Sequence, residues 1–385
     1  MKRKWIKCIA VALAAFLLLP CVCVASTLTA GQGVMEDLPC RSAILMDADT
    51  GEVLFEQSAD EALPPASVTK VMTLLLVMEA IEAGRVRLDE QVRVSANAAS
   101  MGGSQVFLEE GEQMCVEEML KCVVIASAND CAVALAEHVA GSEESFVAAM
   151  NARAAELGMK NTHFENTNGL DDSVENHVTS ARDIAIMSRE LITHPKILEY
   201  SGIWMDTIRN GAFGLTNTNR LVRFYPGCTG LKTGSTARAG FCVSATAKRE
   251  GVSLICVIMG ADTRDVRNTS AAKLLDFGFA HYETFHAEAG EREIRVTGAK
   301  ETTLSVRWPA FGATVAKGSA SRVTCKVDLP ESVEAPVEQG EVLGHVIYEL
   351  DGAELGRVEI CAEQVVPKIE FWGLFYRLLS RIFLL

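Results

Sequence analysis

The chain has 385 residues, of which 49% are hydrophobic and 22% charged, and its formal net charge is −14 at pH 7. This composition excludes intrinsic disorder and a coiled coil, and at about 100–200 residues per domain the length predicts two domains. The acidic balance argues against a nucleic-acid partner.

The first 25 residues have the pattern of a secretory signal peptide. The basic residues Lys2, Arg3, Lys4 and Lys7 precede an apolar run from Cys8 to Leu19. The segment ends with the small residues of Cys23-Val24-Ala25. The apolar run is short for a membrane span, although a retained N-terminal anchor is an alternative. Lipidation of Cys21 is disfavoured because Pro20 stands where a small residue is needed. We therefore predict that the chain is exported and that residues 1–25 are removed.

Apolar periodicity after the signal peptide predicts a large domain of mixed strands and helices. Residues 42–57 alternate around Asp49-Thr50-Gly51, which predicts a β-hairpin with strands near 42–47 and 52–57. The segment Ser67–Ala83 is apolar nearly all round, which is typical of a helix in the centre of a domain. The further predicted elements are helices at 117–124, 130–139, 145–157 and 268–279, and a second hairpin with strands 240–247 and 252–259.

The C-terminal part of the chain changes character twice. From 283 to 366, short alternating segments with Gly and Pro turns predict a small all-β domain. Residues 367–385 combine a narrow stripe that contains Arg377 and Arg381 with a broad, aromatic-rich apolar face. Such a helix suits a membrane interface, the alternative being a core or dimer helix. The predicted organisation is a signal peptide (1–25), a large domain (26–282), a β domain (283–366) and an amphipathic anchoring helix (367–385).

Nine cysteines remain after the three of the first 25 residues are removed. Nine is an odd number for an exported protein, and several of these cysteines lie within apolar runs. We interpret most of them as small buried hydrophobes and not as a disulfide framework. The seven histidines form no HExxH or other close ligand pattern, so no metal and no other cofactor are predicted.

The buried helix begins with Ser67-Val68-Thr69-Lys70, which places a hydroxyl and an amine about one turn apart on one face. A serine hydroxyl needs an adjacent base to become a nucleophile, and a lysine can be that base where burial or a nearby cation makes it neutral. The spacing alone is weak evidence, because Ser270-Ala271-Ala272-Lys273 has it too. We interpret that second match as a solvated helix face.

Two further motifs are equally weak on their own. Ser127-Ala128-Asn129 lies between two predicted helices, where capping residues are ordinary, and Ser95-Ala96-Asn97 repeats its pattern. Lys232-Thr233-Gly234 occurs once, at a predicted strand start, where glycine would let a ligand backbone approach closely. In this order the three motifs match the set Ser-x-x-Lys, Ser-x-Asn and Lys-Thr-Gly of penicillin-binding proteins and serine β-lactamases.

The sequence resembles the low-molecular-mass penicillin-binding proteins of the D-alanyl-D-alanine carboxypeptidase type, peptidase family S11, including its sporulation-associated branch. The resemblance covers residues 42–279. Besides the three motifs, it rests on Met101-Gly102-Gly103-Ser104, Asn161-Thr162-His163-Phe164, Asn168-Gly169-Leu170 and Asn217-Thr218-Asn219. It implies an α/β (α+β) serine D,D-peptidase/β-lactamase-like fold, with an antiparallel sheet flanked by helices and a helical subdomain. A C-terminal all-β domain and a terminal amphipathic helix are also features of that family.

The resemblance implies a role for each motif residue. Ser67 would be the acylated nucleophile and Lys70 its general base; Ser127 would pass a proton to the leaving amine, and Asn129 would orient Lys70 and hold a substrate amide. Lys232 and Thr233 would bind the terminal carboxylate. Gly234 belongs to the same substrate-binding strand, and the N–H groups of Ser67 and Ser235 would form the oxyanion hole.

The expected function is therefore an exported D-Ala-D-Ala carboxypeptidase on the outer face of the cytoplasmic membrane. It would trim peptidoglycan stem pentapeptides, be acylated by β-lactams and contact the membrane surface through residues 368–385. Three alternatives stay open: a D,D-endopeptidase with the same site, a β-lactamase that uses Glu165 within Glu165-Asn166-Thr167-Asn168 for deacylation, and a non-catalytic peptidoglycan-binding envelope protein.

Overall fold

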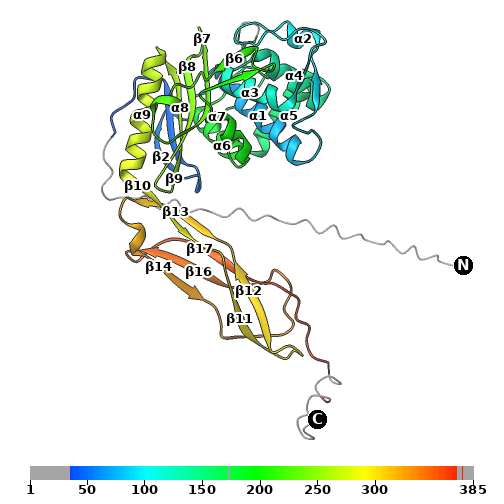
Figure 1. Ribbon diagram of the computed structural model, residues 1–385. Coiled ribbons are helices and arrows are strands. Elements are labelled where there is room, and N and C mark those ends of the chain that lie inside the picture. The colour runs from blue at the N-terminus through cyan, green and yellow to red at the C-terminus, as the bar shows by residue number, and fades with distance from the viewer. Residues whose placement is uncertain (1–34, 172–173, 371–374, 376–385) are drawn as a thin grey trace, which may run out of the picture. The chain divides into compact units, whose positions relative to one another are not determined.

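The computed structural model describes residues 35–171, 174–370 and 375 (Figure 1). The predicted signal peptide lies outside these residues, as does the predicted amphipathic helix beyond position 370 with the exception of residue 375. Within the described residues, no helix has both the length and the apolar character needed to cross a membrane.

A five-stranded antiparallel sheet forms the centre of the larger domain, in the order β2-β1-β9-β8-β7. Its strands are β1 (Ser42–Asp47), β2 (Val53–Gln57), β7 (Cys228–Thr236), β8 (Gly240–Arg249) and β9 (Val252–Ala261). Both predicted hairpins, the first from alternation and the second from two apolar runs, are therefore confirmed. β1 and the middle of β9 are buried on both faces, which explains their nearly continuous apolar sequences.

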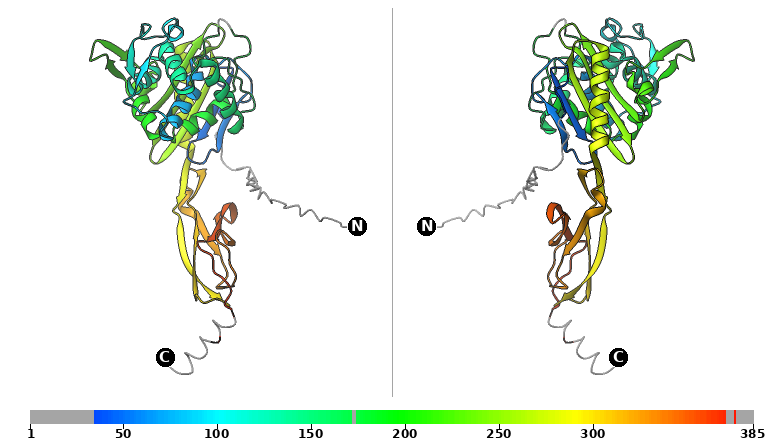
Figure 2. Two further views of the ribbon diagram at one scale, coloured as in Figure 1. Left: turned by 90° about the vertical axis from the view of Figure 1, so that its right-hand side faces the viewer. Right: turned by 90° about the vertical axis from the view of Figure 1, so that its left-hand side faces the viewer.

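Helices cover both faces of this sheet (Figure 2). Helix α9 (Arg264–His281) packs on one face, against β8 and β9, and α6 (Ala181–Leu191) packs on the other, against β1 and β9. Helix α1 (Lys70–Glu82) packs on α6 and has buried side chains all round, as its apolar sequence predicts. The resulting α/β architecture, with helices on an antiparallel sheet, agrees with the predicted fold class.

The remaining helices form a predominantly helical region around α1, shown in cyan and green in Figure 1. The predicted helices at 117–124, 130–139 and 145–157 are confirmed, except that the first one changes to a π-helix in its second half. This region contains η1 (Ala66–Thr69), α2 (Ala96–Ala99), α3 (Val116–Lys121), η2 (Cys122–Ala126), α4 (Asn129–Ala140), α5 (Glu143–Glu156) and α7 (Pro195–Ser201). It also contains two short hairpins, β3 (Gln91–Arg93) with β4 (Gln113–Cys115) and β5 (Met205–Ile208) with β6 (Phe213–Thr216). The short helix α8 (Leu221–Phe224) contacts β7 instead, and its Leu221 belongs to the apolar cluster that α9 shares with the sheet.

The C-terminal region is all-β, as its alternating sequence predicts. A six-stranded sheet has the order β14-β16-β17-β12-β11-β15, and β10 pairs with β13. Its own apolar cluster includes Leu304, Val306, Val346 and Ile360, which is the mark of a separate core. The elements are β10 (Tyr282–Ala287), β11 (Gly290–Thr297), β12 (Thr303–Trp308), β13 (Phe311–Ala316), η3 (Ala320–Arg322), β14 (Val323–Asp328), β15 (Ser332–Glu334), β16 (Val342–Leu350) and β17 (Ala353–Ala362).

All nine cysteines after the predicted signal peptide are free thiols. Four of them are buried, at positions 122, 131, 242 and 256, and four are half-buried. Cys325 is exposed, so the interpretation as core residues does not extend to it.

Candidate active site

Ser67 lies in the short 3₁₀ turn η1, immediately before α1. The residue before it, Ala66, has a φ of 49°, which is a left-handed conformation that alanine rarely adopts. Ser67 itself is half-buried, so it lies at the edge of the core and is partly accessible to solvent. Strained residues of this kind persist where the surrounding structure fixes them, and they concentrate at functional sites.

Strand β7 passes directly beside this turn. A Cβ atom built on Gly234 would lie 2.7 Å from the backbone N of Ser67 and 2.8 Å from the carbonyl of Pro65, so only glycine fits here. The sequence predicts that Gly234 lets a ligand backbone approach closely. In the structure the backbone that approaches Gly234 is that of the turn containing Ser67. Lys232-Thr233-Gly234 lies inside β7, which corrects its predicted position at a strand start, and β7 is an edge strand of the sheet.

Lys70 is completely buried and points at three oxygen atoms. Its Nζ lies 2.8 Å from Oγ of Ser67, 2.6 Å from Oδ1 of Asn129 and 2.7 Å from the carbonyl O of Asn168. The first two contacts join residues that the sequence assigned to one site. The third contact comes from a loop that the sequence did not connect to Lys70.

Burial lowers the pKa of Lys70 well below its usual value, and the positive charge of Lys232 lowers it further, against the opposing effect of Asp130. A neutral amine has two N–H groups and one lone pair. The amide and carbonyl oxygens of Asn129 and Asn168 can only accept, so together they use both N–H groups. The lone pair then points to Ser67, where it can receive the hydroxyl proton.

Ser127 lies in a left-handed turn between two helices. Its φ is 64°, and it follows η2 and precedes α4, which begins at Asn129. The predicted position between two helices is therefore correct. The turn directs Oγ of Ser127 to Nζ of Lys232, at 2.8 Å, while Asn129 reaches Lys70.

Lys232 is 1% exposed and donates to Ser127 and to the carbonyl of Thr233. Burial, with the charge of Arg267, lowers the pKa of Lys232 to about 7. Thr233 donates to Oγ1 of Thr218 at 2.7 Å. Ser235, one residue beyond Gly234, is exposed near the end of the strand.

Hydrogen bonds thus join Ser67, Lys70 and Asn129 in one group and Ser127, Lys232 and Thr233 in a second. Ser127 and Asn129 connect the two groups through one turn, and Gly234 connects β7 to the turn of Ser67. Such an arrangement holds a serine hydroxyl, the amine of Lys70 with a strongly lowered pKa and the amine of Lys232 with a pKa of about 7 beside one edge strand. It is chemically suited to nucleophilic attack on a carbonyl and to the recognition of an anion.

Both repeated motifs lie away from this group. Ser95 caps α2 by accepting from the N–H of Ala98, and Asn97 donates to Glu137 and Glu143. Ser270 lies on the buried side of α9, which corrects its prediction as part of a solvated face; only Lys273 of that pair is exposed. The sequence did not reveal that this serine turns toward the sheet, because α9 has little apolar asymmetry.

The site also uses residues that the sequence analysis gave no role. Asn168 contributes a main-chain carbonyl, Thr218 a hydroxyl and Arg267 a buried positive charge. Asn168 and Thr218 lie in the quoted Asn-Gly-Leu and Asn-Thr-Asn segments, which are a signal that could have found them. No pattern distinguishes Arg267 from other arginines.

The described residues contain no group of three or more His, Cys, Asp and Glu side chains that could hold a metal ion. Glu165, the residue that a β-lactamase would need for deacylation, is exposed. Its carboxylate accepts from the N–H of Asn176.

Comparison with known protein families gives two matches. Residues 29–263 match the D-alanyl-D-alanine carboxypeptidase family, and residues 279–368 match the penicillin-binding protein 5 C-terminal domain. The chain is 41% identical to the D-alanyl-D-alanine carboxypeptidase DacF of Bacillus subtilis, over 86% of this chain and 87% of the relative. It is 34% identical to the D-alanyl-D-alanine carboxypeptidase DacC of Escherichia coli, over 86% of each chain.

Solved structures agree with these matches. Penicillin-binding protein 5 from Haemophilus influenzae superposes with a TM-score of 0.77 at 32% identity, covering 87% of this chain and all of that one. Penicillin-binding protein 6B from Escherichia coli has a TM-score of 0.70 at 29% identity, over 85% of this chain and 96% of the other. The predicted fold and the predicted family are therefore confirmed. The chain belongs to the D-alanyl-D-alanine carboxypeptidase family and is a serine-type carboxypeptidase.

Proposed function

We propose that this carboxypeptidase acts outside the cytoplasm, removes the terminal D-Ala from peptidoglycan stem pentapeptides and works through an acyl-enzyme on Ser67. The observation that carries the proposal is the 2.8 Å contact between Oγ of Ser67 and the completely buried Nζ of Lys70. Burial lowers the pKa of Lys70 well below its usual value, which favours the neutral amine. It is therefore a base at the place where the nucleophile needs one.

Acylation begins when Lys70 takes the hydroxyl proton of Ser67. Oγ attacks the carbonyl carbon of the penultimate D-Ala, and the N–H groups of Ser67 and Ser235 stabilise the oxyanion. The bond to the terminal D-Ala then breaks, and the leaving amine takes a proton from Ser127. Lys232, 2.8 Å from Ser127, can resupply that proton, and water later hydrolyses the ester.

Lys232 and Thr233 select substrates by their free terminal carboxylate. A cationic amine and a hydroxyl on one edge strand provide charge-assisted hydrogen bonds to such a group. Asn129 holds a substrate amide as well as orienting Lys70. β7 is an edge strand, so an extended peptide can lie beside it, while Gly234 lets the turn of Ser67 approach this strand closely.

β-Lactams should acylate the same serine. Penicillin-binding protein D2 of Listeria monocytogenes, 32–33% identical and covering 63–64% of this chain, has been solved in cefotaxime-bound and ampicillin-bound forms. In a β-lactam the amine stays tethered to the acyl group after ring opening. A stable adduct on Ser67 is therefore expected.

The sequences of the N-terminal and C-terminal segments support a membrane location for this activity. We propose that residues 1–25 direct export and are then removed. Residues 368–385, with two arginines and a broad apolar face, then hold the enzyme on the outer surface of the cytoplasmic membrane.

Two other activities use the same chemistry. A β-lactamase would need a deacylating carboxylate, and the exposed Glu165 is bonded to Asn176 instead of to Ser67 or Lys70. A D,D-endopeptidase is the stronger alternative, because a D-alanyl-D-alanine endopeptidase of Pseudomonas aeruginosa is 33% identical over 59% of this chain. A non-catalytic peptidoglycan-binding protein would need neither the neutral Lys70 nor its contact with Ser67.

Hydrolysis of model stem peptides tests the proposal. A pentapeptide ending in D-Ala-D-Ala should release one D-Ala, and a cross-linked peptide dimer should be cleaved poorly. Efficient cleavage of the dimer with little release of D-Ala from the pentapeptide would identify an endopeptidase. Failure to cleave either peptide, with no penicillin adduct, would identify a binding protein.

A further inference from the structure

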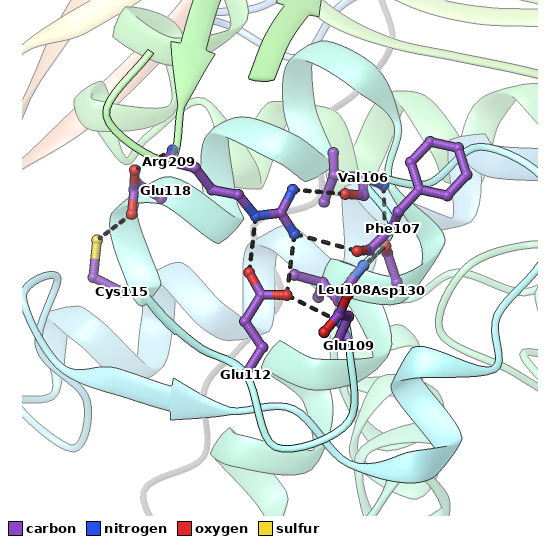
Figure 3. Close-up of polar contacts among 9 residues, drawn as sticks. All are labelled: Val106, Phe107, Leu108, Glu109, Glu112, Cys115, Glu118, Asp130 and Arg209. Atoms are coloured by element: carbon purple, nitrogen blue, oxygen red, sulfur yellow. Dashed lines mark hydrogen bonds and ion pairs between the residues drawn. The ribbon is translucent and has the colours of Figure 1, made fainter. Parts of the chain in front are cut away.

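The loop before β4 has a backbone that is held from both sides (Figure 3). The carboxylate of Asp130 accepts from the N–H groups of Val106 and Leu108, at 3.0 and 3.1 Å. The guanidinium of Arg209 donates to the carbonyls of Val106 and Phe107, at 2.9 and 3.3 Å. A buried anion and a cation thus fix the N–H and C=O groups of the same three residues.

Phe107, at the centre of this segment, has a φ of 57° and is 64% exposed. Its ring meets that of Phe213 edge to face, with 6.3 Å between the centroids, but most of the ring stays exposed, so burial of the side chain contributes little to this left-handed conformation. The hydrogen bonds from Arg209 and to Asp130 account for it. Strained residues that the surrounding structure fixes are concentrated at functional sites, so the conformation of this loop is itself a candidate for a functional role.

Arg209 comes from a different part of the fold, the turn between β5 and β6. Glu112, at the end of the loop, accepts from Nε of Arg209 at 2.8 Å and from Nη2 at 3.1 Å. The same carboxylate accepts from the N–H of Glu109 at 3.0 Å. Arg209 therefore joins the β5–β6 hairpin to the loop through an ion pair and two carbonyl contacts.

The other end of this loop holds Asn129. The carbonyl of Gly102 accepts from Nδ2 of Asn129, and the carbonyl of Ser104 accepts from its N–H, both at 2.7 Å. The side chain of Asn129 in turn accepts from Lys70 at 2.6 Å. A continuous path of hydrogen bonds and a few backbone residues thus runs from Arg209 to the amine beside Ser67.

We propose that Arg209 is a positioning residue: with Glu112 it fixes the loop 102–108, and through Asn129 this loop fixes the amine of Lys70 beside Ser67. Arg209 does not contact Ser67 or Lys70, and its effect on the reaction is geometric. The inference rests on the proposed roles of Ser67, Lys70 and Asn129. A shift of the loop would move the oxygen atom that orients the base.

The test compares Arg209→Lys with a matched control, Arg182→Lys. The side chains of Arg209 and Arg182 are 28% and 29% exposed. Arg182 also donates to carboxylates, those of Glu56 and Asp60. Arg209→Lys should lower the acylation rate by a fluorescent penicillin about tenfold or more, because small displacements at a reacting centre have large effects on rate. Arg182→Lys should change the rate less than about twofold at a similar change in Tm.

A second background separates positioning from general stability. In Asn129→Ala, the contact through which Arg209 acts is absent, so adding Arg209→Lys should lower the residual rate by less than about twofold. Equal effects of Arg209→Lys in both backgrounds, or no effect in either, would overturn the inference. If Arg209→Lys fails to fold, Glu112→Gln takes its place. Its effect on the acylation rate is then compared in the wild-type and Asn129→Ala backgrounds, and the same results support or overturn the inference. Absence of acylation in the wild type would instead reject the proposed function.

Discussion

Lys70 donates a hydrogen bond of 2.7 Å to the main-chain carbonyl of Asn168, a residue 98 positions away in the chain. This contact fixes one N–H of the amine, and Oδ1 of Asn129 fixes another at 2.6 Å. The position of the base beside Ser67 therefore depends on two segments outside its own helix. A change that shifts either segment should affect catalysis more than stability.

Gly169 keeps the carbonyl of Asn168 in place. It has a φ of 83°, and a Cβ atom built on it would lie 1.9 Å from the carbonyl O of Ala66. Gly169→Ala should push the loop away from Lys70 and lower the acylation rate by about tenfold or more. Gly158→Ala is the control, because Gly158 has a φ of 73° but no atom within 4 Å of the added Cβ. Penicillin acylation and Tm measured on both variants check this prediction; equal acylation rates would contradict it.

Lys232 should make the preference for a free carboxylate depend on pH. Its pKa of about 7 means that the amine is cationic below this pH and neutral above it. One charge-assisted hydrogen bond contributes about 1.5–3 kcal/mol, which corresponds to a preference of roughly 10- to 150-fold for the acid over the amide. The ratio of kcat/KM for peptide acid and peptide amide should be largest below pH 7 and should fall above it. Lys232→Ala should shrink the ratio, and a ratio that is constant from about pH 6 to pH 9 in the wild type would remove this role from Lys232.

His177 should make the stability of the fold sensitive to acid. Its Nδ1 accepts from the N–H of Glu165, so Nε2 carries the proton and faces Oγ1 of Thr69 at 2.7 Å. Burial, with a contribution from His163, lowers the pKa of His177 from 6.5 to about 4. Because the unfolded chain binds this proton first, stability is retained above about pH 6.5 and is lost as the pH falls toward 4.

Urea unfolding at several pH values measures this loss. The single histidine accounts for at most about 3 kcal/mol between these two pH values. His177→Gln should reduce the pH dependence in this range more than His286→Gln, whose exposed ring has only a 3.7 Å ion pair with the side chain of Asp49. The same pH dependence in wild type and His177→Gln would contradict the assignment.

Fold and site differ in how far the sequence predicts them. Alternation and apolar runs suffice for both hairpins of the main sheet and for α1, because β1, β8, β9 and α1 are largely buried and β2 alternates beside β1. The sequence missed the β5–β6 hairpin, whose strands are four residues each and mostly not buried. It also assigned Ser270 to solvent, since the apolar residues of α9 do not separate onto one side.

The residues of the site also divide into those that a local sequence pattern predicts and those that it does not. Ser67 and Lys70 are one helical turn apart, so their proximity can be predicted from local spacing. The carbonyl of Asn168 and the guanidinium of Arg209 arrive through tertiary structure, 98 positions from Lys70 and 97 positions from Glu112. Neither contact has a local pattern. A motif can therefore identify the reacting groups, while the groups that position them become visible only in the fold.

Removal of the C-terminal tail should release an active enzyme from membranes. Ile369 still donates to the carbonyl of Gly298, and Lys368 pairs with Ala299, so a cut after Glu370 keeps these contacts of the β domain. No proposed catalytic or substrate-binding residue lies beyond Ser235. The truncated protein should stay in the supernatant after centrifugation of membranes and should retain its carboxypeptidase activity. Continued sedimentation with membranes would indicate that the N-terminal segment is retained as an anchor.

The central claim, an acyl-enzyme on Ser67, is tested most directly by intact-protein mass spectrometry after treatment with penicillin. The wild-type protein and Ser270→Ala should each gain the mass of one penicillin, because Ser270 is a buried residue of α9 and has no part in the site. Ser67→Ala should gain none, and peptide mapping of the wild type should place the adduct on Ser67. An adduct that persists on Ser67→Ala would contradict the account.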